Sequence, residues 1–334
     1  MCLFRLKIRV RKYLGLHLLN SLAALYEVGR QTLPHFRQKY EIGGMHVFSQ
    51  LALSGIALGF VYGLIAMGMV LIFRAVGVVN FAQADFLMLG GFVSYALNQQ
   101  AGLPIGICFG IAALVMGIVG VAFQLCAYWP LRRAKDKTIV VSTLGTAMIL
   151  REGARIIWGA TPKAVDSFIE GSLHIGSTVL QWQYIVIIVT AMILMLGVYL
   201  LLEKTFIGNV LQATAQDQRT ASLMGISVIT AISVTFAISI TITGLGGVLL
   251  APIFFVTNTM GVTTGVKAFT AVIIGGFGNV PGAIIGGLIV GLTETFAGGY
   301  ISTTYKDALI FVMLIIVLIV RPQGLFGEKI SEKV

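Results

Sequence analysis

Long stretches of this chain contain no charged side chain. They cover residues 42–73, 86–131, 171–202, 220–266 and 268–293. A helix needs about 20 apolar residues to cross the hydrocarbon core of a bilayer, so these stretches supply about eight crossings or partial crossings. They lack the alternating polar and apolar pattern of barrel strands. With 57% hydrophobic and 11% charged residues, the sequence predicts an all-α integral membrane protein, a polytopic bundle of about eight transmembrane helices that includes broken or short membrane helices.

The basic residues lie in short segments between the apolar stretches. Three such segments are Arg132–Lys137, Lys204–Arg219 and Arg321–Lys333. Loops rich in lysine and arginine stay on the cytoplasmic side of a membrane, so all three are expected there, and the loop 159–181 is expected outside. The net charge of +10 therefore indicates topology, and no nucleic-acid partner is expected.

Residues that carry chemistry are sparse. The cysteines and histidines are scattered and show no spacing typical of disulfides or of a metal site, so no metal is expected. The chain contains no G-x-x-x-x-G-K-[ST] sequence, the phosphate-binding loop of many ATPases. We therefore expect no enzymatic activity and assign no cofactor to this chain.

Residues 1–44 form a strongly basic N-terminal extension that does not fit this topology. The alternation of spans places Met45 outside, where few basic residues are expected. One explanation is a cleaved signal peptide with an apolar region over residues 14–25. The other is a mis-assigned start, with Met45 as the true first residue. His17 and Asn20 interrupt the apolar region and favour the second explanation, in which residues 45–334 form the membrane domain.

Two apolar helices are expected to begin with polar side chains. Asn80, Gln83 and Asp85 open one in VNFAQADF, and Asn279 precedes another in GGFGNVPGAIIGG. At about 1.5 Å per residue, the short arm 267–275 reaches about mid-membrane, where broken helices usually line a pathway. One interpretation makes these four residues a substrate pathway, in which free N–H groups hold a small carboxylate. The other is that they only cap and pack their helices at the membrane interface.

The polar segment 203–226 interrupts the apolar chain between two spans. In EKTFIGNVLQATAQDQRTASLMG, Ala213, Asp217, Ala221 and Gly225 recur every four residues. This spacing, with apolar residues between, predicts a short helix lying along the membrane surface. Such a helix is either a docking site for a soluble partner or an ordinary cytoplasmic loop.

Charged residues near the expected outer face have two interpretations. Arg151, Glu152 and Arg155 lie in the outer part of a span, where charge must pair or reach water. Glu152 and Arg155 are spaced to pair on one helix face, and the two arginines either reach the outer surface or dock an acidic extracytoplasmic partner. Three further charges, at Glu294, Lys306 and Asp307, are interpreted mainly as boundary charges.

Three motifs together resemble one family. They are VNFAQADF, TFIGNVLQATAQDQRTASLMGI, and FTAVIIGGFGNVPGAIIGGLIVGLTE followed by YKDALIFVMLIIVLIVRPQGLFG. In this order and spacing they resemble permeases of branched-chain amino-acid ABC importers, of the LivH type, over residues 45–334. Gln83 and Ala84 stand where some members have His and Gly. The segment 203–226 also lacks the Glu that begins the coupling motif of other importers.

The resemblance implies a permease of the bacterial inner membrane, embedded in the lipid bilayer, that takes up branched-chain or other hydrophobic amino acids. Its implied partners are a second permease subunit, two cytoplasmic ATPases that bind ATP, and an extracytoplasmic substrate-binding protein. Segment 203–226 would then be the coupling segment, with Asp217 and Arg219 contacting an ATPase groove. Its ATPase-coupling residues would be Ile207, Val210, Leu211, Asp217, Arg219, Ala221 and Gly225. The alternatives are a related importer for urea or short amides, or an ion-coupled secondary transporter, for which Asp85 and Glu294 are the candidate acidic residues.

Overall fold

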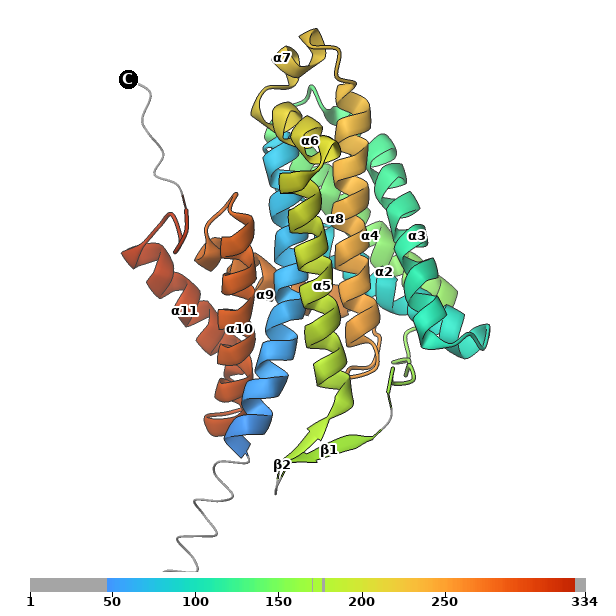
Figure 1. Ribbon diagram of the computed structural model, residues 1–334, viewed down its shortest axis with the longest axis vertical. Helices are drawn as coiled ribbons and strands as arrows, with labels where there is room; N and C mark the ends of the chain where they lie inside the picture. Colours follow the sequence, from blue (N-terminus) through green and yellow to red (C-terminus); the bar gives the residue numbers. More distant parts are fainter. Residues whose placement is uncertain (1–46, 170, 176–177, 328–334) are drawn as a thin grey trace, which may run out of the picture. The chain divides into compact units, whose positions relative to one another are not determined.

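The computed structural model describes residues 47–169, 171–175 and 178–327. Contacts divide the chain into a short unit, Met1–Gln50, and a large unit, Leu51–Val334. The large unit holds the helical bundle (Figure 1). The predicted basic extension, residues 1–44, lies outside the described residues.

Helices form almost all of the described bundle. The first runs over Val47–Val76. The others, in chain order, are α2 (Gln83–Tyr95) with a π-helical turn η1 (Ala96–Gln100), α3 (Ile105–Phe123) with η2 (Gln124–Tyr128) and η3 (Trp129–Leu131), α4 (Asp136–Trp158), α5 (Trp182–Lys204), α6 (Phe206–Gln216), α7 (Gln218–Leu223), α8 (Val228–Leu250), α9 (Met260–Gly275), α10 (Val280–Tyr300) and α11 (Lys306–Val320).

The prediction of an all-α polytopic membrane protein is confirmed. Within the described residues, five helices are long and apolar enough to cross a membrane, namely Val47–Val76, Ile105–Leu131, Trp182–Lys204, Val228–Leu250 and Val280–Tyr300, and Met260–Gly275 is a shorter apolar helix. The expected outer loop contains one feature that was not predicted, an antiparallel pair of strands β1 (Ser172–Ile175) and β2 (Thr178–Gln181). The alternation of polar and apolar residues in Ser172–Ile175 is the local pattern of a strand.

The first helix lies at the centre of the bundle, and α3 and α5 lie at its periphery. In the most apolar part of the first helix 83% of the residues are buried, against 22% for the span that begins with α3 and 28% for α5. All three are strongly apolar, so the exposed faces of α3 and α5 suit lipid. Helix α8 packs between α2 and α3, which brings the two halves of the chain together.

Glycines allow α2 and α8 to approach at backbone distance. A Cβ atom at Gly90 would fall on the carbonyl oxygen of Gly244, and one at Gly247 would fall on the carbonyl oxygen of Leu87. Small residues permit such close contacts between membrane helices, where packing replaces the hydrophobic effect as the main source of stability. The α2–α8 contact therefore fixes the position of α2, whose first turn carries the polar motif.

One end of the bundle gathers segments that the sequence predicts to be cytoplasmic. Helices α6 and α7 lie at the top of Figure 1 and the β1–β2 hairpin at the bottom. Gln218, in α7, donates a hydrogen bond to the carbonyl oxygen of Ala75, at the end of the first helix. Arg74 contacts the turn before α10, and that turn packs against residues 323–327. The basic segments 204–219 and 321–327 thus share one end, as the topology requires.

Candidate functional site

The polar motif at the start of α2 lies inside the bundle. The Gln83 side chain lies against Gly68 of the first helix, so close that a Cβ atom at Gly68 would contact it. Gly68 is eight residues before the end of that helix at Val76, which is about 12 Å along the helix axis. Gly77, with φ of 74°, turns the chain back after that helix. Helix α2 therefore begins within the bundle. The alternative interpretation, in which its polar start only caps the helix at the membrane interface, places it too far out.

Asn80 and Gln83 are buried and hydrogen-bonded. The Asn80 side chain accepts a hydrogen bond from the Ala82 amide at 3.1 Å and donates one to Gln83 Oε1 at 3.1 Å. Gln83 Nε2 donates to Ser239 Oγ at 3.0 Å and to Thr243 Oγ1 at 2.6 Å. Buried amides need such partners, because an unsatisfied one costs about twice what a hydrogen bond contributes. These two side chains thus connect the start of α2 to α8.

Asp85 pairs with Arg151 of α4. Asp85 Oδ1 lies 3.0 Å from Arg151 Nε, and the two side chains are 4% and 30% exposed. The sequence left two alternatives for Arg151, reaching the outer surface or docking an extracytoplasmic partner; in the structure its Nε lies against the Asp85 carboxylate inside the bundle. The other docking candidate, Arg155, pairs with Glu152 at 3.2 Å, and both of those side chains are more than half exposed.

An open cavity of about 390 Å³ lies beside this ion pair. Asn80 and Asp85 of the α2 start, Arg151 of α4 and Gly261 of α9 contribute polar groups or backbone to its wall. Most of the rest of the wall is apolar, formed by Met69, Val79, Phe81, Ala84, Leu144, Val262, Val266 and Phe269. The volume suits a small ligand, and the wall offers one charge of each sign within an aliphatic and aromatic surface.

Asn279 lies elsewhere, at the end of the bundle that carries α6 and α7. It caps α10 by accepting a hydrogen bond from the Gly282 amide at 2.8 Å, and it donates to the carbonyl oxygen of Phe326 at 3.2 Å. It lines a second cavity of about 590 Å³ together with Arg74 and Gln323. The break between α9 and α10 was expected at mid-membrane. It lies at the bundle end instead, because α9 begins before residue 267 and spans Met260–Gly275.

Four phenylalanines lie between the two cavities. Phe81 and Phe269, which line the inner cavity, have ring centroids 5.9 Å apart. Phe269 is 5.8 Å from Phe277, which is 5.2 Å from Phe73, and the last two line the second cavity. The structure therefore brings two predicted pathway residues, Asn80 and Asp85, to the wall of one cavity, places Gln83 behind that wall against α8, and separates Asn279 from them by a row of aromatic rings.

The predicted surface helix of segment 203–226 is two helices, α6 and α7. Asp217 separates them, because its extended backbone ends α6 and its carboxylate caps α7. Asp217 Oδ1 accepts from the Arg219 amide at 2.8 Å, and Oδ2 accepts from the Thr220 hydroxyl at 2.5 Å. Gly225 ends the segment with φ of 84°. A side chain that ends one helix and caps the next cannot be recognised from a four-residue repeat.

The two sides of this segment differ in burial. Leu211 and Ala221 are buried against the bundle, and Val210 is half-buried. Ile207, one of the expected ATPase-coupling residues, is 51% exposed. Three other large apolar side chains, at Phe206, Leu223 and Met224, are about 80% exposed. Sequence reasoning missed them because it assigned docking to the polar residues; apolar residues flanking a polar loop were the available signal.

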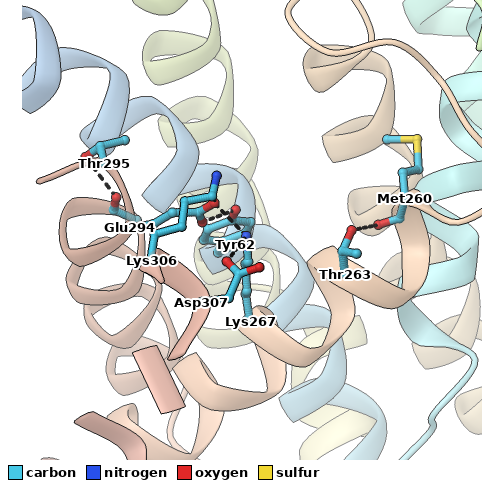
Figure 2. A network of polar contacts seen from close by, with 9 residues as sticks. Tyr62, Met260, Thr263, Lys267, Glu294, Thr295, Lys306 and Asp307 are labelled. Atoms are coloured by element: carbon cyan, nitrogen blue, oxygen red, sulfur yellow. Dashed lines mark hydrogen bonds and ion pairs between the residues drawn. The ribbon is translucent and has the colours of Figure 1, made fainter. Parts of the chain in front are cut away.

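A network of charged groups joins α9, α10, α11 and the first helix (Figure 2). Lys267 Nζ lies 2.5 Å from Glu294 Oε1 and 3.1 Å from Asp307 Oδ1. Lys306 Nζ lies 3.0 Å from the same Glu294 oxygen, and the Tyr62 hydroxyl donates to Glu294 Oε2 at 2.6 Å. Glu294 is buried, and both of its carboxylate oxygens have partners. The sequence predicted only a charge at the membrane boundary, whereas in the structure Glu294 links four helices.

Comparisons with known proteins give one consistent result. Residues 51–318 match the family model described as branched-chain amino acid transport system, permease component. The high-affinity branched-chain amino acid transport system permease protein LivH of Escherichia coli (strain K12) is 34% identical over 302 residues, covering 86% of this chain and 98% of that protein. BraD of Pseudomonas aeruginosa, also named a high-affinity branched-chain amino acid transport permease, is 30% identical over 303 residues, with the same two shares. A probable branched-chain amino acid transport permease of Methanocaldococcus jannaschii is 28% identical over 284 residues, covering 79% and 88%.

Proposed function

Because this chain belongs to the family of branched-chain amino acid transport permeases, we propose that it forms part of the membrane path of an ABC importer for branched-chain or other hydrophobic amino acids. The family match over residues 51–318 is the observation that carries the proposal. The chain is a multi-pass membrane protein whose family acts in transport. The bacterial inner membrane is its proposed location.

The proposed assembly contains a second permease subunit, two cytoplasmic ATPases and an extracytoplasmic binding protein. ATP would bind to the ATPases. Segment 203–226 supports this division of labour, since it exposes Phe206, Leu223 and Met224 beside polar Arg219 at one end of the bundle. Apolar anchors within a polar rim are typical of protein interfaces. Buried Leu211 and Ala221 transmit a push on this face to the bundle because they pack against it.

The proposed path runs through the inner cavity beside Asn80, Gln83 and Asp85. Of the two hydrogen-bonded amides, only Asn80 lines the cavity wall; Gln83 holds the start of α2 against α8. Asn279 lies on the second cavity and belongs to the path only if the two cavities connect during transport. The apolar wall beside a charge pair suits an amino acid with an aliphatic side chain better than it suits urea.

Reconstitution of the permease with its partner subunits in lipid vesicles tests the proposal. We expect uptake of leucine, isoleucine or valine that requires ATP and the binding protein. Arg219→Ala and Leu223→Ser should lower both uptake and ATP hydrolysis, because both side chains lie on the exposed face of α7.

Each alternative has its own outcome in this assay. Uptake driven by an ion gradient without the ATPases would replace the importer with an ion-coupled transporter, whose candidate acidic residues Asp85 and Glu294 are both buried and ion-paired. ATP-driven uptake of urea or short amides, without uptake of amino acids, would identify those molecules as the cargo. Unchanged ATP-driven uptake in both α7 variants would remove the docking assignment.

A further inference from the structure

We propose that Asp85 and Arg151 bind the two charged groups of a zwitterionic α-amino acid in the inner cavity. The ligand's ammonium group would contact Asp85, and its carboxylate would contact Arg151. This inference rests on the proposed function, because it assigns the binding site for that cargo. It adds the residues that recognise the charged groups and the exchange of partners that binding requires.

The carboxylate of Asp85 has a charge partner but lacks a well-aligned hydrogen bond. Its side chain is 4% exposed, and Oδ1 lies 3.0 Å from Arg151 Nε. Among the residues that the structure describes, Oδ1 accepts no hydrogen bond, and Arg151 Nε donates to the carbonyl oxygen of Ala147 at 3.3 Å. A buried carboxylate oxygen without a donor is costly. An ammonium group supplies three N–H donors and satisfies it.

Arg151 is suited to the other end of the ligand. It is 30% exposed and its contacts among the described residues run through Nε. The terminal nitrogens of its guanidinium therefore face no partner in that part of the chain. Guanidinium groups bind carboxylates through two parallel hydrogen bonds, which gives both strength and orientation.

Exchange of partners keeps the cavity electrically neutral. Before binding, the negative Asp85 faces the positive Arg151; afterwards, each faces the opposite charge of the zwitterion. A ligand with only one charged group would leave one protein charge unpaired in an apolar wall, which is unfavourable. The pair thus selects molecules that carry both charges, and Met69, Leu144, Val262 and Val266 contact the aliphatic side chain.

Protection of a cavity residue from labelling tests this site in the fully assembled transporter. Val266 lines the cavity and is 43% exposed, so Val266→Cys in a background without the native cysteines gives a thiol that a methanethiosulfonate reagent can reach. Leucine should slow labelling. 4-Methylpentanoate, which lacks the ammonium group, and 3-methylbutylamine, which lacks the carboxylate, should not protect at the same concentration.

Asp85→Asn should raise the half-protecting concentration of leucine at least about tenfold, the loss expected for one charge-assisted contact. Glu152→Gln is the matched control, because it removes the negative charge of an exposed pair with Arg155 on α4, the helix that also carries Arg151. It should leave the half-protecting concentration of leucine unchanged. The site is overturned if 4-methylpentanoate and 3-methylbutylamine protect as well as leucine does. It is also overturned if the half-protecting concentration of leucine is unchanged in Asp85→Asn. If Asp85→Asn does not assemble, the comparison of the three probes on the parent protein decides.

Failure of this site and failure of the proposed function give different results. An unmodified transporter that takes up leucine with ATP, combined with unchanged protection in Asp85→Asn, retains the function and removes the site. A complete absence of ATP-driven uptake of branched-chain and other hydrophobic amino acids removes the function itself.

Discussion

Lys267 of α9 and Glu294 of α10 are joined by a 2.5 Å contact between Nζ and Oε1, and both side chains are nearly inaccessible to solvent. Removing either partner leaves the network of Lys267, Glu294, Lys306 and Asp307 with one uncompensated charge, and breaking a buried pair in this way costs about 3 kcal/mol or more. We predict that Lys267→Met and Glu294→Gln each lower the thermal stability of the detergent-solubilised protein by an amount of that order.

The double variant should lose less than the sum of the single losses, because it leaves no stranded charge at this pair. Coupling of about 0.5–3 kcal/mol is typical for residues in contact. Arg155→Gln, in the exposed pair with Glu152, should change stability by less than about 1 kcal/mol. Strict additivity of the two buried substitutions would show that Lys306, Asp307 and Tyr62 fully compensate each loss.

Gly90 sets the distance between α2 and α8. Gly90→Ala should lower stability by about 1–3 kcal/mol, because the added methyl group would meet the backbone of Gly244. Gly110→Ala is the control, since an added Cβ atom at Gly110 in α3 meets nothing within 4 Å. Alanine favours helix over glycine, so this control should be neutral or stabilising. Equal thermal stabilities of the two variants would contradict the close approach.

The membrane spans could be predicted from the sequence because apolar stretches and the basic loops between them indicate spans directly. The charge-free stretch 171–202 contains all but the last two residues of α5, Trp182–Lys204, and the stretch 220–266 contains α8, Val228–Leu250. The deep start of α2 was not readable. Asn80 and Asp85 have the composition of an interfacial cap, and only contacts with Gly68 and Gly261, distant in the chain, show that this cap lies inside.

The pairing within the candidate site also depends on distant contacts. Asp85 was a predicted pathway residue, and Arg151 was assigned to docking because it lies late in its span. The sequence carries no local signal that these two meet. Likewise, the sequence shows Lys267 only as one charge between two apolar stretches. Its partner Glu294 becomes evident only in the structure, where α9 packs beside α10.

Asp217 makes the start of α7 sensitive to acid. Hydrogen bonds from the Thr220 hydroxyl and from the Thr220 and Arg219 amides lower the pKa of Asp217 below its usual value. A lowered pKa means that the cap is fully formed above about pH 4 and is lost as the pH falls through the folded-state pKa. Hydrogen exchange over residues 218–224, corrected for intrinsic rates, should therefore accelerate in acid.

Two substitutions separate the charge of Asp217 from its capping geometry. Asp217→Ala should accelerate exchange over residues 218–224 at neutral pH, because two amides lose their acceptor. Asp217→Asn retains an acceptor oxygen and should stay close to the parent protein while losing the dependence on pH. Acid-sensitive exchange that persists in Asp217→Asn would assign the titration to another group.

Leu211 and Leu223 have the same side chain on opposite sides of the proposed coupling segment. Leu211 is 7% exposed and Leu223 is 81% exposed. Leu211→Ala should lower stability by about 2–4 kcal/mol through the cavity it leaves. Leu223→Ala should preserve stability and reduce ATP-driven uptake in the reconstituted transporter. Normal uptake in a stable Leu223→Ala protein would place the ATPase contact elsewhere on the segment.

Phe269 contacts both Phe81 and Phe277, at centroid distances of 5.9 and 5.8 Å, and so separates the inner cavity from the cavity at the other end of α9. Phe269→Ala removes the ring that links the two pairs and should connect the cavities. In a cysteine-free background, Ala84→Cys on the inner cavity wall should then react several-fold faster with a charged thiol reagent added from the side of α6 and α7. Phe296→Ala is a matched control, because its ring stacks on Tyr300 and lines neither cavity. Equal labelling with and without the Phe269 ring would mean that other side chains close the passage, and Asn279 would then have no route to the cavity that holds Asp85.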